Sequence, residues 1–416
     1  MTTTAANASR VPLTPKLRRL LFSIFPANLA IFLVWGATTG VLLQAQVQEI
    51  DPANKEASYA LIAGIGALCA LLAQPIAGVV SDRTRSRFGK RAPWLVGGAI
   101  VGAIALIGVG SSNTILQLFL SWCAVQITLN FTQGPLSAVL PDRVPRARRG
   151  LFSSMMGLGL PAGMLGGQVL GALLVPRFLL AYLLFGGFLV LAVVAFVLIN
   201  PQGTNASEPR EPFDWRAFLR TFWVNPVAHP DFFWAFAGRL LINTGYTLIS
   251  TYNLFILQEY IGLTLQEALA QLPVVAGVGL VGMLITTLTS GPLSDRVGRR
   301  RVFVFACSGI LTVALLVPLV FPTLTGILIY AFVAGLGFGV FQSVDTALIT
   351  EVLPSATDYG KDLGVINIAA ALPQTIAPAA AGFIVLRLGG YSALFPWAIA
   401  FVVLGGLSVW MIRSVR

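Results

Sequence analysis

The sequence predicts an all-α membrane protein with twelve transmembrane helices arranged as two pseudo-symmetric six-helix bundles. Three observations lead to this fold class. Hydrophobic residues make up 56% of the 416-residue chain and charged residues only 10%, whereas soluble domains carry about 25% charged residues. The apolar residues gather in twelve long runs, and one short charged turn recurs half a chain apart. Lipid is therefore the expected solvent, and duplication is the expected origin of the two halves.

Each predicted span is an apolar run near the roughly 20 residues that a helix needs to cross the hydrocarbon core. The first half contains the runs 20–44, 59–80, 94–111, 115–140, 151–175 and 180–199. The second half contains the runs 231–257, 268–290, 302–321, 324–350, 362–386 and 393–412. Residues 1–199 and 231–416 are thus the expected bundles, joined by a polar, proline-rich cytoplasmic linker at 200–230. The first run is too long for a cleavable signal, and no small-residue cleavage site follows it.

The basic residues indicate how the chain is oriented in the membrane. Most of the 27 Lys and Arg residues fall in segments on the side of the N-terminus, including 83–91, 143–149 and 296–301. We therefore expect a multi-pass protein of the cytoplasmic (inner) membrane with both termini in the cytoplasm. The net charge of +11 follows from this topology, so a nucleic-acid partner is not expected. The bilayer is the expected partner, and a monomer is the expected state.

The repeated turn reads GVVSDR at 78–83 and GPLSDRVGRR at 291–300. The first copy is expanded, because five residues (84–88) separate Arg83 from the next glycine where the second copy has Val297 alone. A carboxylate at a helix end can accept hydrogen bonds from the amides of a neighbouring helix, and the following Arg can pair with other acids. We expect these turns to gate the cytoplasmic side; the alternative is that they only set topology. The expected gating residues are Asp82, Arg83, Asp142, Asp295, Arg296 and Glu351.

The doubled turn, the twelve spans and the central loop resemble the major facilitator superfamily over nearly the whole chain. Three stretches resemble its sucrose and glycoside–cation symporter branch: SDRTRSRFGKRAPW at 81–94, NFTQGP at 130–135 and GVINIAAALPQ at 364–374. The resemblance implies a secondary active or facilitative transporter that moves a small polar solute, a sugar or glycoside, by alternating access. A proton-driven drug or metabolite exporter on the same fold is the nearest alternative. A membrane-embedded enzyme or receptor is a more distant one, because the sequence has no nucleophile–base set.

A binding site is expected near the midplane between the halves. Polar side chains at helical spacing follow five spans, and amides, hydroxyls and aromatic rings suit a polyhydroxylated ligand. The alternative for each residue, and for Thr39 and Gln46 in the first span, is helix–helix hydrogen bonding. The candidate substrate-binding residues are Asn28, Trp35, Gln126, Asn130, Gln133, Asn243, Tyr246, Asn253, Gln342, Asn367 and Gln374.

Two charged residues lie well inside the spans, Arg239 in the seventh and Asp345 in the tenth. Intramembrane charges are costly and are usually paired or functional, so we expect these two to form an ion pair. The pair either couples transport to protons or holds two helices together. The resemblance adds a constraint, because proton-coupled sucrose carriers have an acid at the position of Gln126, which cannot titrate. Coupling has therefore moved to Asp345, or the protein is a facilitator.

Other potential sites are absent from the sequence or lack the necessary pattern. Cys69, Cys123 and Cys307 lie in apolar spans without the spacing of a disulfide framework or metal site. His229, the one histidine, lies in the linker, and no G-x-x-x-x-G-K-[ST] loop occurs. We expect no cofactor, no metal and no ATP-driven step on this chain. The glycine-rich stretches 157–167 and 335–339 predict close helix packing.

Overall fold

The computed structural model describes residues 13–207, 229–297, 300–351 and 359–412, without the side chains of 146, 291–292, 295, 346–347, 349–351, 359–367 and 370. All regular structure in these residues is helical. Within these described ranges, ten helices are long and apolar enough to cross a membrane, or eleven when one bent pair is taken as a single span. The 29-residue helix α15 (Tyr359–Arg387) completes the predicted set of twelve. Backbone contacts divide the chain into two compact units, residues 1–58 with 65–211 and residues 59–64 with 212–416.

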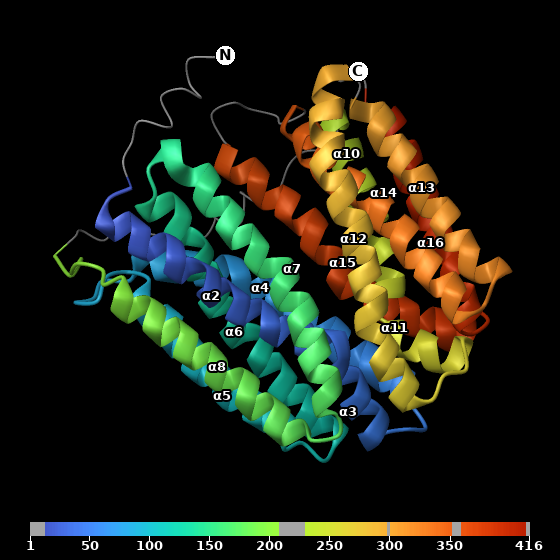
Figure 1. The fold of residues 1–416 in the computed structure, drawn as a ribbon, viewed down its shortest axis with the longest axis horizontal. Helices are drawn as coiled ribbons and strands as arrows, with labels where there is room; N and C mark the ends of the chain where they lie inside the picture. Colours follow the sequence, from blue (N-terminus) through green and yellow to red (C-terminus); the bar gives the residue numbers. More distant parts are fainter. Residues whose placement is uncertain (1–12, 208–228, 298–299, 352–358, 413–416) are drawn as a thin grey trace. The chain divides into compact units, whose positions relative to one another are not determined.

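The first unit opens with a continuous 36-residue span, Pro15–Ile50. Thr14 caps its start by accepting a hydrogen bond from the amide of Leu17, and Pro15 occupies the first helical position, where no amide is needed. The elements are α2 (Pro15–Ala37), η1 (Thr38–Leu42), α3 (Leu43–Ile50), α4 (Lys55–Arg83), α5 (Ala92–Gly110), α6 (Ile115–Arg143), η2 (Arg146–Arg148), α7 (Arg149–Leu174) and α8 (Phe178–Ile199). Helix α2 packs along α7 and α8, and α5 packs along α6 and α8 (Figure 1).

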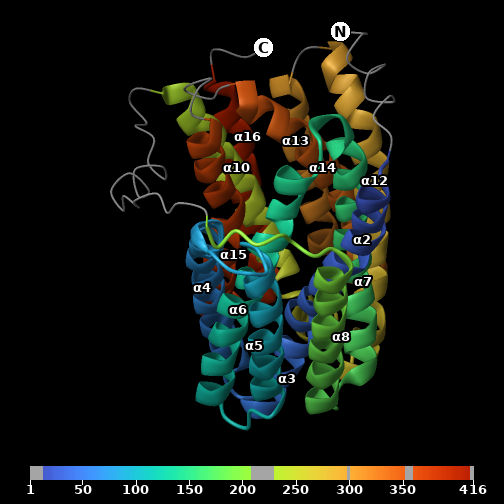
Figure 2. The same cartoon turned by 90° about the vertical axis from the view of Figure 1, so that its left-hand side faces the viewer.

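The second unit follows the same plan after the linker. Its elements are α10 (Pro230–Ser250), α11 (Asn253–Phe255), η3 (Ile256–Tyr260), α12 (Leu265–Val297), α13 (Arg300–Val320), α14 (Leu324–Glu351), α15 (Tyr359–Arg387), η4 (Tyr391–Ala393) and α16 (Leu394–Trp410). Helix α10 packs against α15 and α16, while α13 lies between α14 and α16 (Figure 2). The predicted linker begins where α8 ends, at Ile199.

Two sets of equivalent helices make equivalent contacts in the two units. The first long helix of each unit packs on the fifth and sixth, as α2 does on α7 and α8, and α10 on α15 and α16. The third helix packs on the fourth and sixth, as α5 does on α6 and α8, and α13 on α14 and α16. The turn repeated in the sequence therefore belongs to a repeat of whole bundles.

The first span of each unit also contains a stretch of wider π-helical turn. In the first unit this stretch is Thr38–Leu42, and in the second it is Ile256–Tyr260. The span predicted at 231–257 as one helix is in fact broken, with a bend of 47° between α10 and the residues from Asn253 onward. An apolar run shows how long a span is, but it does not reveal a bend inside the span. Such π segments interrupt the regular ladder and often occur at functional sites.

Glycines bring neighbouring helix backbones into direct contact in both units. A Cβ atom on Gly167 of α7 would overlap the carbonyl oxygen of Leu33 in α2, and one on Gly335 of α14 would overlap that of Gly279 in α12. The packing predicted for the glycine-rich stretches is thus present at these positions. At Gly157 the prediction is wrong, because a Cβ atom there would meet nothing within 4 Å.

Candidate functional site

The two charges inside the spans lie together in the second unit. Nη1 of Arg239 in α10 is 2.9 Å from Oδ2 of Asp345 in α14, and only 11% and 3% of the two side chains are exposed. The ion pair expected from the sequence is therefore present. The two residues are 106 positions apart in the chain, so the fold brings them together, not local sequence.

The contact between the two charges is close but incompletely hydrogen-bonded. Arg239 Nη1 and Asp345 Oδ2 are not aligned for a hydrogen bond and find no other partner among the described residues, and neither does Arg239 Nε. Burying a charge with incomplete hydrogen bonding costs free energy that the ion pair alone does not fully recover. The site therefore retains donor and acceptor capacity for a proton, a water molecule or a polar solute.

Two further candidates lie along α10 beyond this pair. Asn243 donates a hydrogen bond from Nδ2 to the carbonyl oxygen of Arg239 at 2.8 Å, so its amide oxygen stays available as an acceptor. Tyr246 stacks on Phe338 of α14, with ring centroids 4.0 Å apart and planes 9° from parallel. Phe338, which the sequence analysis did not nominate, thus helps to fix the phenol ring of Tyr246 between α10 and α14.

The first unit carries a neutral polar cluster on α2 and α6. The indole Nε1 of Trp35 donates to Oε1 of Gln133 at 2.9 Å, and the Trp35 ring meets the edge of Trp122 at a centroid distance of 6.4 Å. Gln126 and Asn130 are buried on the same helix, and Asn130 donates to the Gln126 carbonyl. We call these five residues the amide–indole cluster. Its amide oxygens and rings are the kinds of group that bind neutral polar ligands.

Trp122 was missed by the sequence analysis, although a signal for it existed. It precedes Gln126 by four residues and so continues the stripe of Gln126, Asn130 and Gln133 by one turn. Its Nε1 is buried without a hydrogen-bond partner among the described residues. A Cβ on Gly66 of α4 would lie against this part of the indole, so the glycine leaves room for the ring between α4 and α6.

The remaining candidates are placed differently by the structure. Asn28 is buried against Gly159 of α7, and Gln46 donates to the Val109 carbonyl at 2.7 Å; Gln46 thus follows the helix–helix alternative. Asn253 is half-buried just beyond the break after α10, whereas Gln342 and Gln374 are exposed. The side chain of Asn367 lies outside the described residues.

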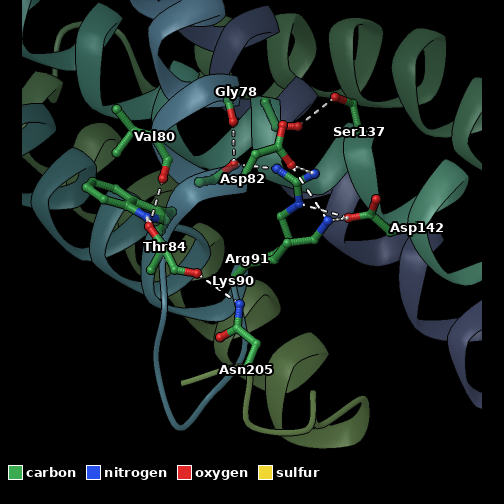
Figure 3. Close-up of polar contacts among 12 residues, drawn as sticks. Gly78, Val80, Asp82, Thr84, Lys90, Arg91, Ser137, Asp142 and Asn205 are labelled. Carbon is green, nitrogen blue, oxygen red and sulfur yellow. Dashed lines mark hydrogen bonds and ion pairs between the residues drawn. The ribbon is translucent and has the colours of Figure 1, made fainter. Parts of the chain in front are cut away.

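A charged cluster occupies the end of α4, where the first Asp-Arg turn begins (Figure 3). Arg91, immediately before α5, places Nη2 2.5 Å from Asp82 Oδ1 and Nε 3.0 Å from Asp142 Oδ2, and also bonds the Ser81 hydroxyl. Lys90 lies 3.7 Å from Asp82 and 3.2 Å from Asp142. Three helices therefore meet through two carboxylates and two cations, and Lys90 and Arg91 are partners that the sequence analysis did not nominate.

The start of the linker is bound to this cluster. Gln202 Oε1 accepts a hydrogen bond from the backbone amide of Arg91 at 3.2 Å. Asn205 donates a hydrogen bond to the Thr84 carbonyl oxygen at 2.9 Å and accepts one from the Ser86 amide at 3.0 Å. Thr84 and Ser86 belong to the five-residue expansion of the first turn, so the expansion provides the docking groups for the linker. In the second turn, Arg296 is exposed. The side chains of Asp295 in that turn and of Glu351 at the end of α14 lie outside the described residues.

Comparison with known proteins agrees with this architecture. The family model for the Major Facilitator Superfamily matches residues 20–287 and 254–414. The chain belongs to the Major Facilitator Superfamily. The bacterial homolog of the human lysosomal transporter Spinster, in an inward-facing and occupied conformation, has a TM-score of 0.72 at 15% identity, with 97% of this chain and 98% of that one covered. The nucleoside transporter NupG also gives 0.72, at 13% identity over 94% and 98% of the chains.

The relatives within the family differ in whether their names state a transported solute and in how much of the chain they match. The sucrose transport protein SUC4 of Arabidopsis thaliana is 30% identical over an alignment of 140 residues, and the match covers 28% of this chain and 27% of that protein. The uncharacterized MFS-type transporter YuxJ of Bacillus subtilis is 24% identical over 363 residues, 85% and 87% of the two chains. The match to the sucrose carrier thus spans about a quarter of its length, while the match to YuxJ is nearly complete.

Proposed function

We propose that this protein carries a small polar solute, a sugar or glycoside, across the cytoplasmic membrane by alternating access. The observation that carries the proposal is the amide–indole cluster, a group of neutral hydrogen-bonding side chains and indole rings in the interior of the first bundle. A sugar offers many neutral donors and acceptors together with apolar ring faces, which amides and indoles bind. The partial similarity to a sucrose transport protein supports the same solute class.

The ion pair of Arg239 and Asp345 supplies the proposed coupling site. Gln126 of the amide–indole cluster occupies the position where proton-coupled sucrose carriers have an acid, but its amide cannot exchange a proton. A proton-coupled mechanism therefore needs an acid at a different position. Asp345 is buried, paired and incompletely hydrogen-bonded, which are the properties of an acid whose charge depends on its surroundings. Protonation would release Arg239 from α14 and so change the contact between two helices of the second unit.

The charged cluster at the end of α4 supplies the proposed gate. Arg91, which lies between α4 and α5, forms an ion pair with Asp82 of α4 and donates a charge-assisted hydrogen bond to Asp142 near the end of α6. Contacts of this kind are lost when helix ends separate and re-form when they meet. We propose that Asp82, Arg83 and Asp142 alternate between such arrangements during transport, together with their counterparts in the second unit, Asp295, Arg296 and Glu351. Both termini would then lie on the cytoplasmic side.

Uptake into proteoliposomes tests the proposal. Purified protein is reconstituted, and entry of labelled disaccharides and glycosides is compared with entry of amino acids, nucleosides and lipophilic cations. We expect saturable uptake of a sugar or glycoside, and Gln133→Ala to raise its half-saturation concentration about 2- to 12-fold, equivalent to one lost neutral hydrogen bond. Ser154→Ala, on an exposed position of α7, is the control. Uptake of lipophilic cations alone would favour an exporter and contradict the proposal.

A further inference from the structure

A groove between α2 and α8 differs in its charge from the groove that α8 forms with α5. It has a volume of about 660 Å³ and runs along the first turns of α2 and the last turns of α8, which lie side by side (Figure 1). Most of its wall is apolar, but two arginines contribute to it. Its lining includes Phe22 and Pro26 of α2, Ala192, Ala195 and Phe196 of α8, and the arginines Arg18 and Arg19.

The arginines lie at one end of this groove. Arg18 and Arg19 are in the first turn of α2, next to Ile199 at the last residue of α8. Pro26 and Ala192 lie seven residues farther into their helices, or about 10 Å at 1.5 Å per residue. The groove therefore has a cationic end near the membrane surface and an apolar end in the hydrocarbon region. This is the distribution of charge that a phospholipid with an anionic headgroup would complement.

A second groove on α8 provides an internal comparison. It lies against α5, has a volume of about 450 Å³ and is lined entirely by apolar side chains and glycines, Val190 among them. Acyl chains of any lipid suit such a surface. The α2–α8 groove adds two guanidinium groups, which hold phosphate oxygens through paired hydrogen bonds. The two grooves therefore differ in the lipid headgroup that they would favour: the α2–α8 groove suits an anionic headgroup, and the groove against α5 has no charged group to select one.

The guanidinium groups of the groove are available for such a ligand. Both arginines are exposed, and neither forms an ion pair within the part of the chain that the structure describes. The one hydroxyl in the lining, Ser23, is already engaged, because it donates to the Arg19 carbonyl and accepts from Asn200 Nδ2 at 2.7 Å. Ser23 thereby ties α2 to the end of α8 and leaves headgroup binding to the arginines.

We propose that the α2–α8 groove binds a phospholipid with an anionic headgroup. The phosphate lies on Arg18 and Arg19, and one acyl chain runs along Phe22, Pro26 and Ala195. The lipid comes from the leaflet at the basic end of the bundle. The proposal concerns a lipid-facing surface and does not depend on which solute the protein transports.

Native mass spectrometry of the full-length protein in neutral detergent tests the proposal. The probes are phosphatidylglycerol and phosphatidylcholine with identical acyl chains. We expect tighter binding of one phosphatidylglycerol, and about thirtyfold weaker binding in Arg18→Gln/Arg19→Gln, from about fivefold for each basic residue. Lys16→Gln is the matched control, since Lys16 is exposed on the same turn but does not line the groove. An equal loss in Lys16→Gln, or no preference between the lipids, would overturn the proposal.

A second pair of variants tests the apolar part of the groove. Ala195→Trp fills it and leaves both arginines in place, whereas Val190→Trp adds the same bulk to the comparison groove on the same helix. We expect Ala195→Trp to reduce phosphatidylglycerol binding at least tenfold and Val190→Trp to leave it unchanged. Unaltered binding in Ala195→Trp, or equal binding of glycerol phosphate without acyl chains, would show that the groove holds no lipid chain and would refute the proposal. Thermal unfolding of each variant confirms that it is folded.

Discussion

Arg91 is the side chain on which the charged cluster depends. Its side chain is 5% exposed and contacts both Asp82 and Asp142, whereas the Lys90 side chain is 35% exposed and lies farther from each carboxylate. Hydrogen bonds to charged groups contribute about 1.5–3 kcal/mol when buried, while exposed ion pairs contribute less than about 1 kcal/mol. The two neighbouring cations are therefore expected to differ in importance despite carrying the same charge.

We predict that Arg91→Gln destabilises the protein by about 1–3 kcal/mol and slows transport, whereas Lys90→Gln changes stability by less than about 1 kcal/mol. The range for Arg91 is lowered because Asp82 is half-exposed. The measurement is the thermal unfolding midpoint in detergent, together with the initial rate of uptake in proteoliposomes. Equal midpoints for the two variants would show that the cluster is not held by Arg91.

Gly89 controls how the linker meets the first Asp-Arg turn. Its φ of +82° is a backbone conformation that residues with a side chain rarely adopt, and a Cβ would collide with the side chain of Gln202. We predict that Gly89→Ala costs about 1–2 kcal/mol locally and releases the linker from Thr84 and Ser86. Amide hydrogen exchange of residues 200–207 should become faster.

Gly203 provides the control for this effect, because it lies in the same linker segment and a Cβ there meets nothing within 4 Å. Gly203→Ala should leave the exchange rates of residues 200–207 nearly unchanged. If Gly89→Ala also left them unchanged, the hydrogen bonds of Gln202 and Asn205 would not be what holds the linker in place.

At the scale of the helices, backbone contact between α2 and α7 depends on glycines four residues apart. At Gly163, Gly167 and Gly171, a Cβ would approach the backbone of α2, which cannot move as a side chain can. We predict that Gly167→Ala destabilises the first unit by about 1–3 kcal/mol, the usual cost of overpacking. The thermal unfolding midpoint of the purified protein measures this effect.

Gly157→Ala is the matched control, since it lies on the same helix with open space around the added methyl group. It should be neutral or stabilising, because alanine favours the helix over glycine by about 0.5–1 kcal/mol. A similar loss in both variants would mean that contact with α2 does not determine the result.

The sequence predicted the helices well because the length of an apolar run is a local property. It predicted the ends less well. Helix α2 starts at Pro15 and its span continues to Ile50, so polar residues at both ends belong to the helix although they lie outside the apolar run. The bend after Ser250 is not visible in the apolar pattern, which continues through it. Both differences escape a prediction from the apolar pattern, because neither a polar helix end nor a bend changes the length of the apolar run.

For the whole molecule, the repeated turn was the most informative feature, because it indicated duplication before any helix was placed. The sequence also nominated both partners of the buried ion pair, since a charge inside an apolar span is rare enough to stand out. It could not separate Gln46, which binds a backbone carbonyl, from Gln133, which binds Trp35. Both are amides in polar stripes, and only their neighbours in space distinguish them. Arg91 was hidden for a similar reason, among many basic residues of the same loop.

The ion pair is the point at which energy coupling of the whole transporter can be tested. Asparagine keeps the shape of Asp345 but carries no titratable proton, so Asp345→Asn removes the proposed coupling group while preserving much of the packing. Because the substitution also leaves Arg239 as an unpaired buried cation, it carries a stability cost that can reach about 3–5 kcal/mol. The double variant Arg239→Gln/Asp345→Asn removes both charges and controls for that cost.

We predict that Asp345→Asn abolishes accumulation of solute against a gradient but leaves counterflow exchange at a rate within a few-fold of the wild type. Exchange needs the binding site and the conformational change, whereas accumulation also needs the proton. The double variant should behave in the same way and unfold at a higher temperature than the single variant. Proteoliposomes with an imposed pH gradient provide the measurements of accumulation and of counterflow exchange.

If either variant still accumulated solute in a proton-dependent way, the pair would be a structural contact between α10 and α14. If the wild type accumulated nothing under any ion gradient, the protein would be a facilitator, and the same contact would serve to hold the two helices together.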